Sequence, residues 1–320
     1  MSESRISQYL AYHKASAAIG DIDPGQAMLR YLVERYELNV EQRYYLAFLY
    51  AQSYCGATAF YHYNEWPDLE NIDFNRMERW WLARGREESL FQTDRRWPRS
   101  RNQVVDSFRS YSALLCGKTQ HEHFSQFNQP TPEERYNAIL LWAKNIYTFG
   151  QFALFLYIEA LHTTTLLDLC PTDLDLEKAW SCRYGLYFAY GLDDLVHDKQ
   201  SYMEAPELTA EKWTELKSTV AQLEQPPTIW STETLLCAFR KYHRGKRYIG
   251  FYLDRQAVEI AKMQNSVRSG IHWDVLWQYR RETYDAQWLA EVDGHVDAKG
   301  LSPEWRDFQW SRTHRILEEA

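Results

Sequence analysis

One segment of the sequence concentrates positive charge around a tryptophan. In FQTDRRWPRSR, residues 91–101, four arginines surround Trp97, namely Arg95, Arg96, Arg99 and Arg101. The planar guanidinium group of arginine binds a phosphate through two parallel hydrogen bonds, and an indole stacks on a nucleobase. The segment therefore predicts contact with phosphate-bearing nucleic acid; the alternative is a solvated basic loop.

A second segment in the later half of the chain combines basic and aromatic residues in the same way. RKYHRGKRYIGFYLDR, residues 240–255, interleaves arginine and lysine with tyrosine and phenylalanine, and its two glycines permit a close approach of the backbone to a ligand. If both segments line one groove, their positive potential is focused where a phosphate backbone would run. The alternative is two separate solvated faces.

Carboxylates at two places have the types and spacing for metal or proton chemistry. In YGLDDLVHDK, residues 190–199, the neighbouring carboxylates of Asp193, Asp194 and Asp198 suit Mg²⁺ held jointly with a diphosphate. Their spacing is like that of the aspartate-rich helix of diphosphate-using prenyl transferases, but with one extra residue and no second acidic motif. The alternative is a helix terminus with capping acids. Glu159 stands in the apolar segment FALFLYIEALH, where it either acts as a base of raised pKa or pairs with an arginine. Arg183, in SCRYGL, is a further candidate contact for an anion.

Composition limits the classes of protein that fit. The chain has 320 residues, with 36 basic against 44 acidic side chains, so a nucleic-acid binder of this balance must gather its positive charge on one face. Five scattered cysteines form no CxxC pair, which favours a reducing compartment and predicts no zinc site. The start of the chain lacks a secretory pattern and the longest apolar stretch is too short to span a bilayer. We therefore expect a cytoplasmic protein without a membrane partner.

The elements that must position these residues are predicted to be helices. Apolar residues recur at three- and four-residue steps almost throughout, and strand-like alternation is nearly absent. Asp23, Asp73 and Thr131 are predicted to begin helices, the first and last because a proline follows directly. Residues 39–66 indicate one long helix or a kinked pair ended by Pro67, and further helices are expected at about 148–163, 177–190, 209–224, 231–245, 249–268 and 273–290. The fold class is all-α, a multi-helix globular fold.

Several segments, in this order, resemble one known family: YAQSYCGATAFYHYNEWPDLENID, FQTDRRWPRSR, YTFGQFALFLYIEAL, SCRYGL followed by GLDD, and RYIGFYLDRQAVEI followed by GIHWDVLWQYRRE. The family is that of the phage amino acid:DNA transferases, also called α-glutamyl/putrescinyl thymine pyrophosphorylases. The likeness covers roughly residues 45–290, which sets a transferase domain between an N-terminal helical extension (1–44) and a C-terminal tail (291–320). One departure is that arginines stand where the family carries a lysine near Trp97.

The resemblance implies a fold distantly akin to helical DNA glycosylases and a reaction on double-stranded phage DNA. In that reaction the 5-methyl group of thymine has been hydroxylated, giving 5-hydroxymethyluracil, and then pyrophosphorylated, and a free amino acid or polyamine displaces pyrophosphate. Glycine is the donor we expect here, in the cytoplasm of a phage-infected bacterium. The resemblance implies no redox or carbonyl cofactor. It leaves open whether Mg²⁺ binds at Asp193 and Asp194. The alternatives are a glycosylase-like base-excision or DNA-binding protein and a diphosphate-using prenyl transferase.

The same resemblance distributes roles among the candidate residues. The base that deprotonates the amine is expected among Asp94, Glu159, Asp193 and Asp194. Pyrophosphate and other anions are expected to meet Arg95, Arg96, Arg183, Lys246, Arg247 and Arg255, the last as a partner for the carboxylate of an amino acid. DNA and its flipped base are expected to contact Gln92, Trp97, Arg99, Arg101, Tyr157, Arg240, Tyr248 and Tyr252.

Overall fold

The computed structural model describes residues 5–92, 95–197, 202–268 and 270–319. Within these ranges nearly all the regular secondary structure is helical. The elements run in the order α1 (Arg5–Ala18), α2 (Pro24–Arg35), α3 (Val40–Ser53), α4 (Gly56–Glu65), α5 (Phe74–Trp80), the π-helical turn η1 (Trp81–Gly85), α6 (Arg86–Glu88), α7 (Arg96–Ser100), α8 (Val104–Leu114), α9 (Gln120–Phe124), α10 (Pro132–Ala143), α11 (Gln151–Thr164), α12 (Trp180–Ala189), the 3₁₀ turn η3 (Asp193–Leu195), α13 (Pro206–Val220), α14 (Ile229–His243), α15 (Phe251–Ser266), α16 (Asp274–Thr283), the 3₁₀ turn η4 (Ala286–Trp288), β1 (Val296–Asp297), β2 (Gly300–Leu301) and α17 (Pro303–Glu318). The strands pair as one short antiparallel hairpin. The predicted all-α fold is confirmed.

The predicted helix starts rest on side-chain caps. Asp23 accepts a hydrogen bond from the Gly25 N–H at 3.0 Å in front of α2, and Asp73 accepts two backbone N–H bonds in front of α5. Thr131 forms a capping box with Glu134 at the start of α10. Each cap satisfies backbone donors that the first turn of a helix leaves without partners, which is why these three starts are legible in the sequence.

The segment expected as one long helix or a kinked pair is a pair, α3 and α4. Tyr54 ends α3 in the left-handed conformation, with φ of 52°, and Cys55 is extended before α4 begins. Gly56, the first residue of α4, lies against Met28 of α2, so that a Cβ atom there would come within 2.6 Å of the sulfur. The break lets α4 turn away from α3 while both stay packed in the core.

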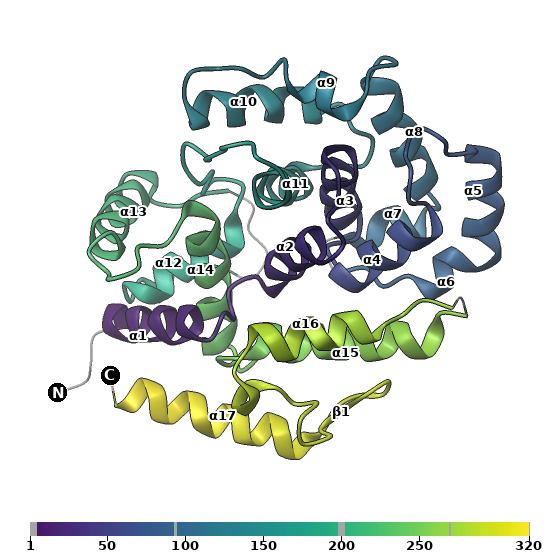
Figure 1. The fold of residues 1–320 in the computed structure, drawn as a ribbon. Helices are drawn as coiled ribbons and strands as arrows, with labels where there is room; N and C mark the ends of the chain where they lie inside the picture. The colour runs from purple at the N-terminus through teal and green to yellow at the C-terminus, as the bar shows by residue number, and fades with distance from the viewer. Residues whose placement is uncertain (1–4, 93–94, 198–201, 269, 320) are drawn as a thin grey trace.

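The centre of the molecule is built from α3 and α11, which pack against each other and against α2 (Figure 1). On one side of this centre α12 and α14 form the most intimate helix pair. Gly185 of α12 makes this approach possible, since a Cβ atom there would lie 2.0 Å from the carbonyl oxygen of Leu236. Helices α12 and α14 are therefore in direct backbone contact.

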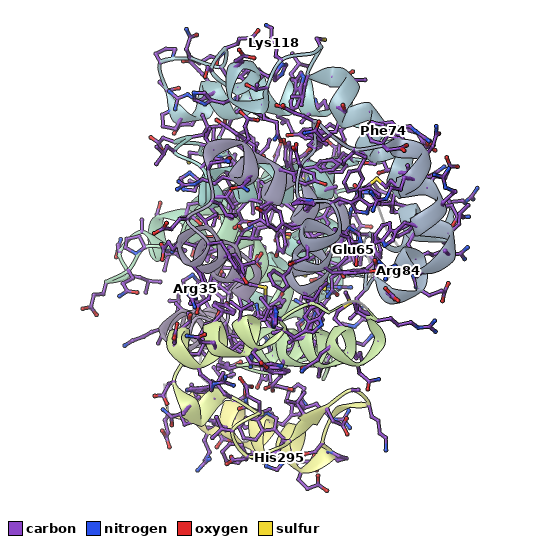
Figure 2. The ribbon with its side chains drawn as sticks, turned by 45° about the vertical axis from the view of Figure 1, so that its right-hand side comes forward. Arg35, Glu65, Phe74, Arg84, Lys118 and His295 are labelled. Carbon is purple, nitrogen blue, oxygen red and sulfur yellow. The ribbon has the colours of Figure 1, made fainter. Side chains whose placement is uncertain are left out.

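The N- and C-terminal helices lie side by side at one edge, where α1 packs on α17 (Figure 1). Between them and the body, Asp21 accepts backbone N–H bonds from Gly250 at 2.7 Å and Leu253 at 2.9 Å, which ties the loop after α1 to the start of α15. At another edge, Glu65 of α4 and Arg84 of η1 form an ion pair at 2.6 Å and lie together in Figure 2. The predicted division at residues 44 and 290 stays a prediction. No described helix has the length and apolarity that a bilayer span requires.

Candidate functional site

A cavity of about 980 Å³ opens among α10, α11, α12, α14 and the start of α15. Its aromatic wall consists of Tyr54, Tyr136, Phe149, Phe152, Phe155, Trp180 and Tyr252, and its charged residues are Lys144, Lys178, Lys241, Arg247, Arg255, Asp173, Asp175 and Glu233. Pockets that bury a small molecule usually measure about 300–1,000 Å³, so this one is at the large end of that range. It combines a mostly apolar lining with cations and one buried carboxylate.

Arg247 is the cation most deeply enclosed in this wall, with 8% of its surface exposed. Its guanidinium group donates a hydrogen bond to the hydroxyl of Tyr252 and lies 4.6 Å from the centre of that ring and 5.3 Å from the ring of Phe251. No carboxylate among the described residues forms an ion pair with it. Glu233 is near enough to interact with Arg247 electrostatically but forms no ion pair with it, so the guanidinium group remains available to an anion from outside the protein.

Arg255 lines the cavity one helical turn after Tyr252, and an ion pair with Glu259 partly balances its charge. Its Nε donates to the Glu259 carboxylate at 3.0 Å, and its guanidinium lies 5.6 Å from the ring of Tyr54. The Glu259 contact uses only the Nε of the guanidinium group, and Arg255 lines the cavity together with Tyr54 and Tyr252. Arg247 and Arg255 thus supply two guanidinium groups to one cavity.

Three lysines stand around the cavity, and they differ in their partners. Lys178 is paired with Asp175 at 2.9 Å, whereas no ion pair within the described ranges involves Lys144 or Lys241. Trp180 is 41% exposed and its ring lies 4.6 Å from the guanidinium of Arg240. The cavity lining therefore includes two ammonium groups without an ion pair and an accessible indole, groups of the kinds that bind a phosphate backbone and stack on a base.

Behind the cavity three carboxylates approach one another. Burial raises the pKa of Glu159 well above its usual range, and repulsion from Asp23 and Glu233 raises it further. Burial also raises the pKa of Asp23 to about 6, although hydrogen bonds from the Tyr50 hydroxyl and the Gly25 N–H oppose this. Glu233 itself lines the cavity and accepts a hydrogen bond from the Cys182 thiol at 2.9 Å. These carboxylates stand at the start of α2, on α11 and on α14, and only the packing of these three helices brings them near one another.

Four predicted residues lie in the cavity lining: Gln92, Arg247, Tyr252 and Arg255. They come from both basic segments, so the structure brings parts of residues 91–101 and 240–255 to one cavity. Glu159 does not line the cavity, but it is coupled electrostatically to Glu233, which does.

Arg183 lies away from the cavity lining, in a structural position. It is completely buried, and its two terminal nitrogens donate to the carbonyl oxygens of Leu176 and Glu177, both at 2.7 Å, and of Tyr202 at 2.8 Å. With both terminal nitrogens engaged by the main chain, the side chain binds the loop before α12 to the segment after η3. Its Nε has no hydrogen-bond partner but is buried in the same place.

The predicted acidic pair also lies outside the cavity lining. Asp193 and Asp194 are exposed on η3, where Asp193 forms an ion pair with Arg5 of α1. Lys246 is exposed in the turn after α14 and does not line the cavity either. In the described parts of the chain, no group of three His, Cys, Asp or Glu residues is placed to hold a metal ion.

Three further predicted residues are buried with protein partners. The hydroxyl of Tyr157 donates to that of Tyr111 at 3.1 Å, and the hydroxyl of Tyr248 donates to Asp254 at 2.9 Å. Arg95 donates to the carbonyl oxygens of Ala51 at 3.0 Å and Thr148 at 2.9 Å, and burial lowers its pKa to about 10. None of the three lines the cavity.

The remaining predicted DNA contacts are spread over the surface and the interior. Arg99 donates to the carbonyl oxygen of Arg86 at 2.9 Å, Arg101 is exposed, and Arg240 is buried against the ring of Trp180. The predictions for Asp94 and Asp198 fall outside the described residues, as do those for the side chains of Arg96 and Trp97.

The sequence did not single out Asp23, Glu233, Lys144 or Trp180 as parts of a site, and it included Lys241 only within the basic segment 240–255. It predicts Asp23 only as a helix start and Glu233 only as part of a helix. A usable signal for Glu233 is its place between apolar residues of an amphipathic helix, the same argument that singles out Glu159. Lys144 carries no such signal, because a lone lysine at a helix end is common on any surface.

Comparison with known proteins agrees with this reading of the chain. A family model described as amino acid:DNA transferase matches residues 18–248, which is more than half of the 320 residues. No curated protein and no solved structure is significantly similar to the chain. The resemblance identified from the sequence segments is thereby confirmed, while the expected likeness to helical DNA glycosylases stays a prediction. With its helical fold and a matched region that supplies most of the cavity wall, the chain belongs to the amino acid:DNA transferase family.

Proposed function

We propose that the cavity joins the amine of a free amino acid, glycine in the first place, to a diphosphate-activated pyrimidine in double-stranded phage DNA and releases pyrophosphate. The family supports an amino acid and DNA as substrates. The activated base of the proposal is 5-hydroxymethyluracil pyrophosphorylated on its methylene oxygen. The observation that carries the proposal is Arg247, a buried guanidinium at a large cavity with no carboxylate partner among the described residues.

The size and lining of the cavity support a base that leaves the DNA stack. A reactive methylene on a pyrimidine inside a protein cavity requires the nucleotide to be extruded, which costs a few kcal/mol that stacking and hydrogen bonds must offset. Tyr54 and Phe152, whose ring centres are 5.4 Å apart, and the nearby Tyr252 offer faces for such a base, and Gln92 offers an amide for its edge. About 980 Å³ leaves room for an amine beside it.

The rim supports a positively charged path for the DNA backbone. Lys144 and Lys241 are the two cavity lysines without an ion pair in the described structure, and each can neutralise one phosphate beside the extruded nucleotide. The exposed ring of Trp180 offers a surface on which the base next to the extruded nucleotide can stack. This arrangement meets the requirement that an acidic chain must gather its positive charge locally.

The departure of pyrophosphate calls for cations close to the oxygen that gains charge. Arg247 is the best-placed candidate, with Lys241 beside it on the cavity wall. Fixed, partly desolvated cations stabilise a developing negative charge more strongly than water does, because they need no reorganisation during the reaction. We assign this role to Arg247 and Lys241 because both line the cavity.

The amine must lose protons before and after it attacks. A carboxylate takes one proton from the donor ammonium, and the freed lone pair on nitrogen forms a bond to the 5-methylene carbon. The carbon–oxygen bond breaks, its electron pair leaves with pyrophosphate, and the new secondary ammonium gives a second proton to water. Of the bases predicted from the sequence, Glu159 has the raised pKa that a base for this step needs, and Glu233 connects it to the cavity.

The test is a transfer assay with defined DNA. Purified protein is incubated with duplex DNA that carries the pyrophosphorylated base and with glycine, glutamate or putrescine, and the nucleosides are then analysed by mass spectrometry. A nucleoside that is heavier than 5-hydroxymethyldeoxyuridine by the mass of the amine minus that of water supports the proposal. The absence of any adduct with every amine would refute it, and strand cleavage by alkali after incubation would indicate a base-excising glycosylase instead.

A further inference from the structure

We infer that Asp23, Gln26, Glu159 and Glu233 together form a binding site for a protonated primary amine in the wall of the cavity. The inference rests on the proposed function only in taking that amine to be the ammonium end of the donor. It names three residues, Asp23, Gln26 and Glu233, for which the sequence suggested no part in a site.

The first observation is that the carboxylates of this cluster have no ion-pair partner among the described residues. Asp23 precedes α2, Glu159 lies on α11 and Glu233 lies on α14, and none of the three forms an ion pair in the described structure. Arg255 and Arg247 are near enough to influence Asp23 and Glu233, but Glu159 has only the two other carboxylates as charged neighbours. Three carboxylates so placed repel one another unless protons or a cation are bound between them.

The second observation is independent of charge and concerns hydrogen bonds. Gln26 is only 7% exposed, yet neither its amide nitrogen nor its amide oxygen has a hydrogen-bond partner. The side chain lies near Glu159, although neither of its amide atoms meets the geometry of a hydrogen bond there. The second carboxylate oxygen of Asp23 is buried and likewise has no partner. Buried polar groups nearly always find a partner, so several orphaned atoms at one place indicate a ligand that completes them.

The chemistry of these atoms fits an ammonium group better than a metal ion. An ammonium has three N–H donors and no acceptor, and the cluster offers the free oxygens of Asp23 and Gln26 with the carboxylates of Glu159 and Glu233. Metal ions require ligands converging at fixed short distances, and the described residues contain no such group of three. Charge-assisted hydrogen bonds in a low-dielectric wall would hold the ammonium firmly.

Access and polarity agree with an amino acid as the occupant. Glu233 lines the cavity, so an amine can reach the cluster from there. On the same cavity wall Arg247 and Arg255 supply positive charge. A zwitterion therefore finds carboxylates for its ammonium and guanidinium groups for its carboxylate, whereas an acid without an amine lacks the first contact.

The experiment measures amine binding without chemistry. Glycine, methylammonium and acetate are titrated calorimetrically into the whole protein, in two buffers of different ionisation enthalpy, with and without unmodified duplex DNA. We expect the two amines to bind and to release protons, because the ammonium displaces protons that the carboxylates share. Glu159→Gln and Gln26→Leu should weaken the binding of both amines by about tenfold or more and abolish the proton release.

Controls separate the site from the fold. Glutamine has the size and shape of glutamate without its charge, so Glu159→Gln should leave the melting temperature nearly unchanged. Glu233→Gln is a second variant at the cavity surface. Glu88→Gln is the matched control, because Glu88 is a buried carboxylate on α6 that accepts from the Tyr61 hydroxyl and does not line the cavity. Its amine binding should equal that of the wild type.

The outcomes also separate this inference from the proposed function. Amine binding that needs Glu159 and Gln26, together with no adduct on activated DNA, would leave the site standing and refute the transferase proposal. Adduct formation together with equal amine binding by all variants would refute the site and leave the transferase standing. Failure of the wild-type protein to bind either amine, with or without DNA, would also overturn the inference.

Discussion

Replacing Arg247 by methionine should abolish most of the turnover while leaving the fold intact. Methionine keeps a long flexible side chain among Phe251, Tyr252 and Cys237 but removes the charge. Because the charge is buried without a carboxylate partner among the described residues, its loss separates the catalytic role of the residue from its structural one.

The contributions of Arg247 to stability nearly cancel. The hydrogen bond to the Tyr252 hydroxyl is worth about 1.5–3 kcal/mol because its donor is charged, and the contacts with the two rings add about 0.5–2 kcal/mol. Against this stands the cost of burying a cation without a counter-ion, which is several kcal/mol. We therefore expect the unfolding free energy to change by about 1 kcal/mol, and Tm by roughly 2–4 °C.

The effect on the reaction should be much larger. Loss of one fixed group that stabilises charge in a transition state typically lowers kcat by about 10²–10³-fold, equivalent to about 2.7–4 kcal/mol. The assay is single-turnover release of pyrophosphate from activated DNA at saturating glycine, with Tm measured on the same preparation. Arg30→Met, at an exposed position of α2 outside the cavity lining, is the matched control and should react like the wild type.

Two results would refute this reasoning. A fall in Tm of more than about 8 °C would show that Arg247 mainly holds the fold together. Unchanged pyrophosphate release would show that the leaving group meets other cations, even if the protein stays folded.

Three further predictions follow from the contacts. Arg183→Ala should destabilise the protein by about 3 kcal/mol or more, read from urea unfolding, because three main-chain carbonyls lose their donor; an unchanged unfolding midpoint would contradict its structural role. Burial raises the pKa of Asp254 from 3.8 to about 6, so the folded state binds a proton that the unfolded state releases, and the free energy of unfolding falls as pH rises from about 4 to about 6. Relative to Asp254→Asn, the wild type should lose about 3 kcal/mol of unfolding free energy over this range. Parallel curves of unfolding free energy against pH for the two proteins would exclude the effect. Removing Lys144 and Lys241 together should lower the slope of log Kd for DNA against log salt by about 2, and an unaltered slope would place the backbone elsewhere.

Much of the fold was predictable because it is encoded locally. The caps at Asp23, Asp73 and Thr131 are formed by residues within a few positions of the helices they begin, so sequence alone identifies them. The expected helices at 148–163 and 231–245 correspond to α11 and α14, which run Gln151–Thr164 and Ile229–His243. The break at Tyr54 was less certain from sequence, because a non-glycine residue in the left-handed conformation gives little local signal.

The candidate site was predictable only in part, because burial and partners are decided by tertiary packing. Arg183 and Arg247 look alike in sequence, each near a glycine and aromatic residues. In the structure the terminal nitrogens of Arg183 donate to main-chain carbonyls, whereas Arg247 lines the cavity. Asp23 and Glu233 lie far apart in sequence and join Glu159 only when α2, α11 and α14 pack, so no local pattern could have grouped them.

The contact at Gly185 has a consequence for the carboxylate at the cavity. Cys182 of α12 and Glu233 of α14 both line the cavity and are joined by a hydrogen bond from the thiol to the carboxylate. A single methyl group at position 185 would collide with the Leu236 carbonyl and force the two helices apart. The placement of Glu233 thus depends on a glycine that is itself outside the cavity lining.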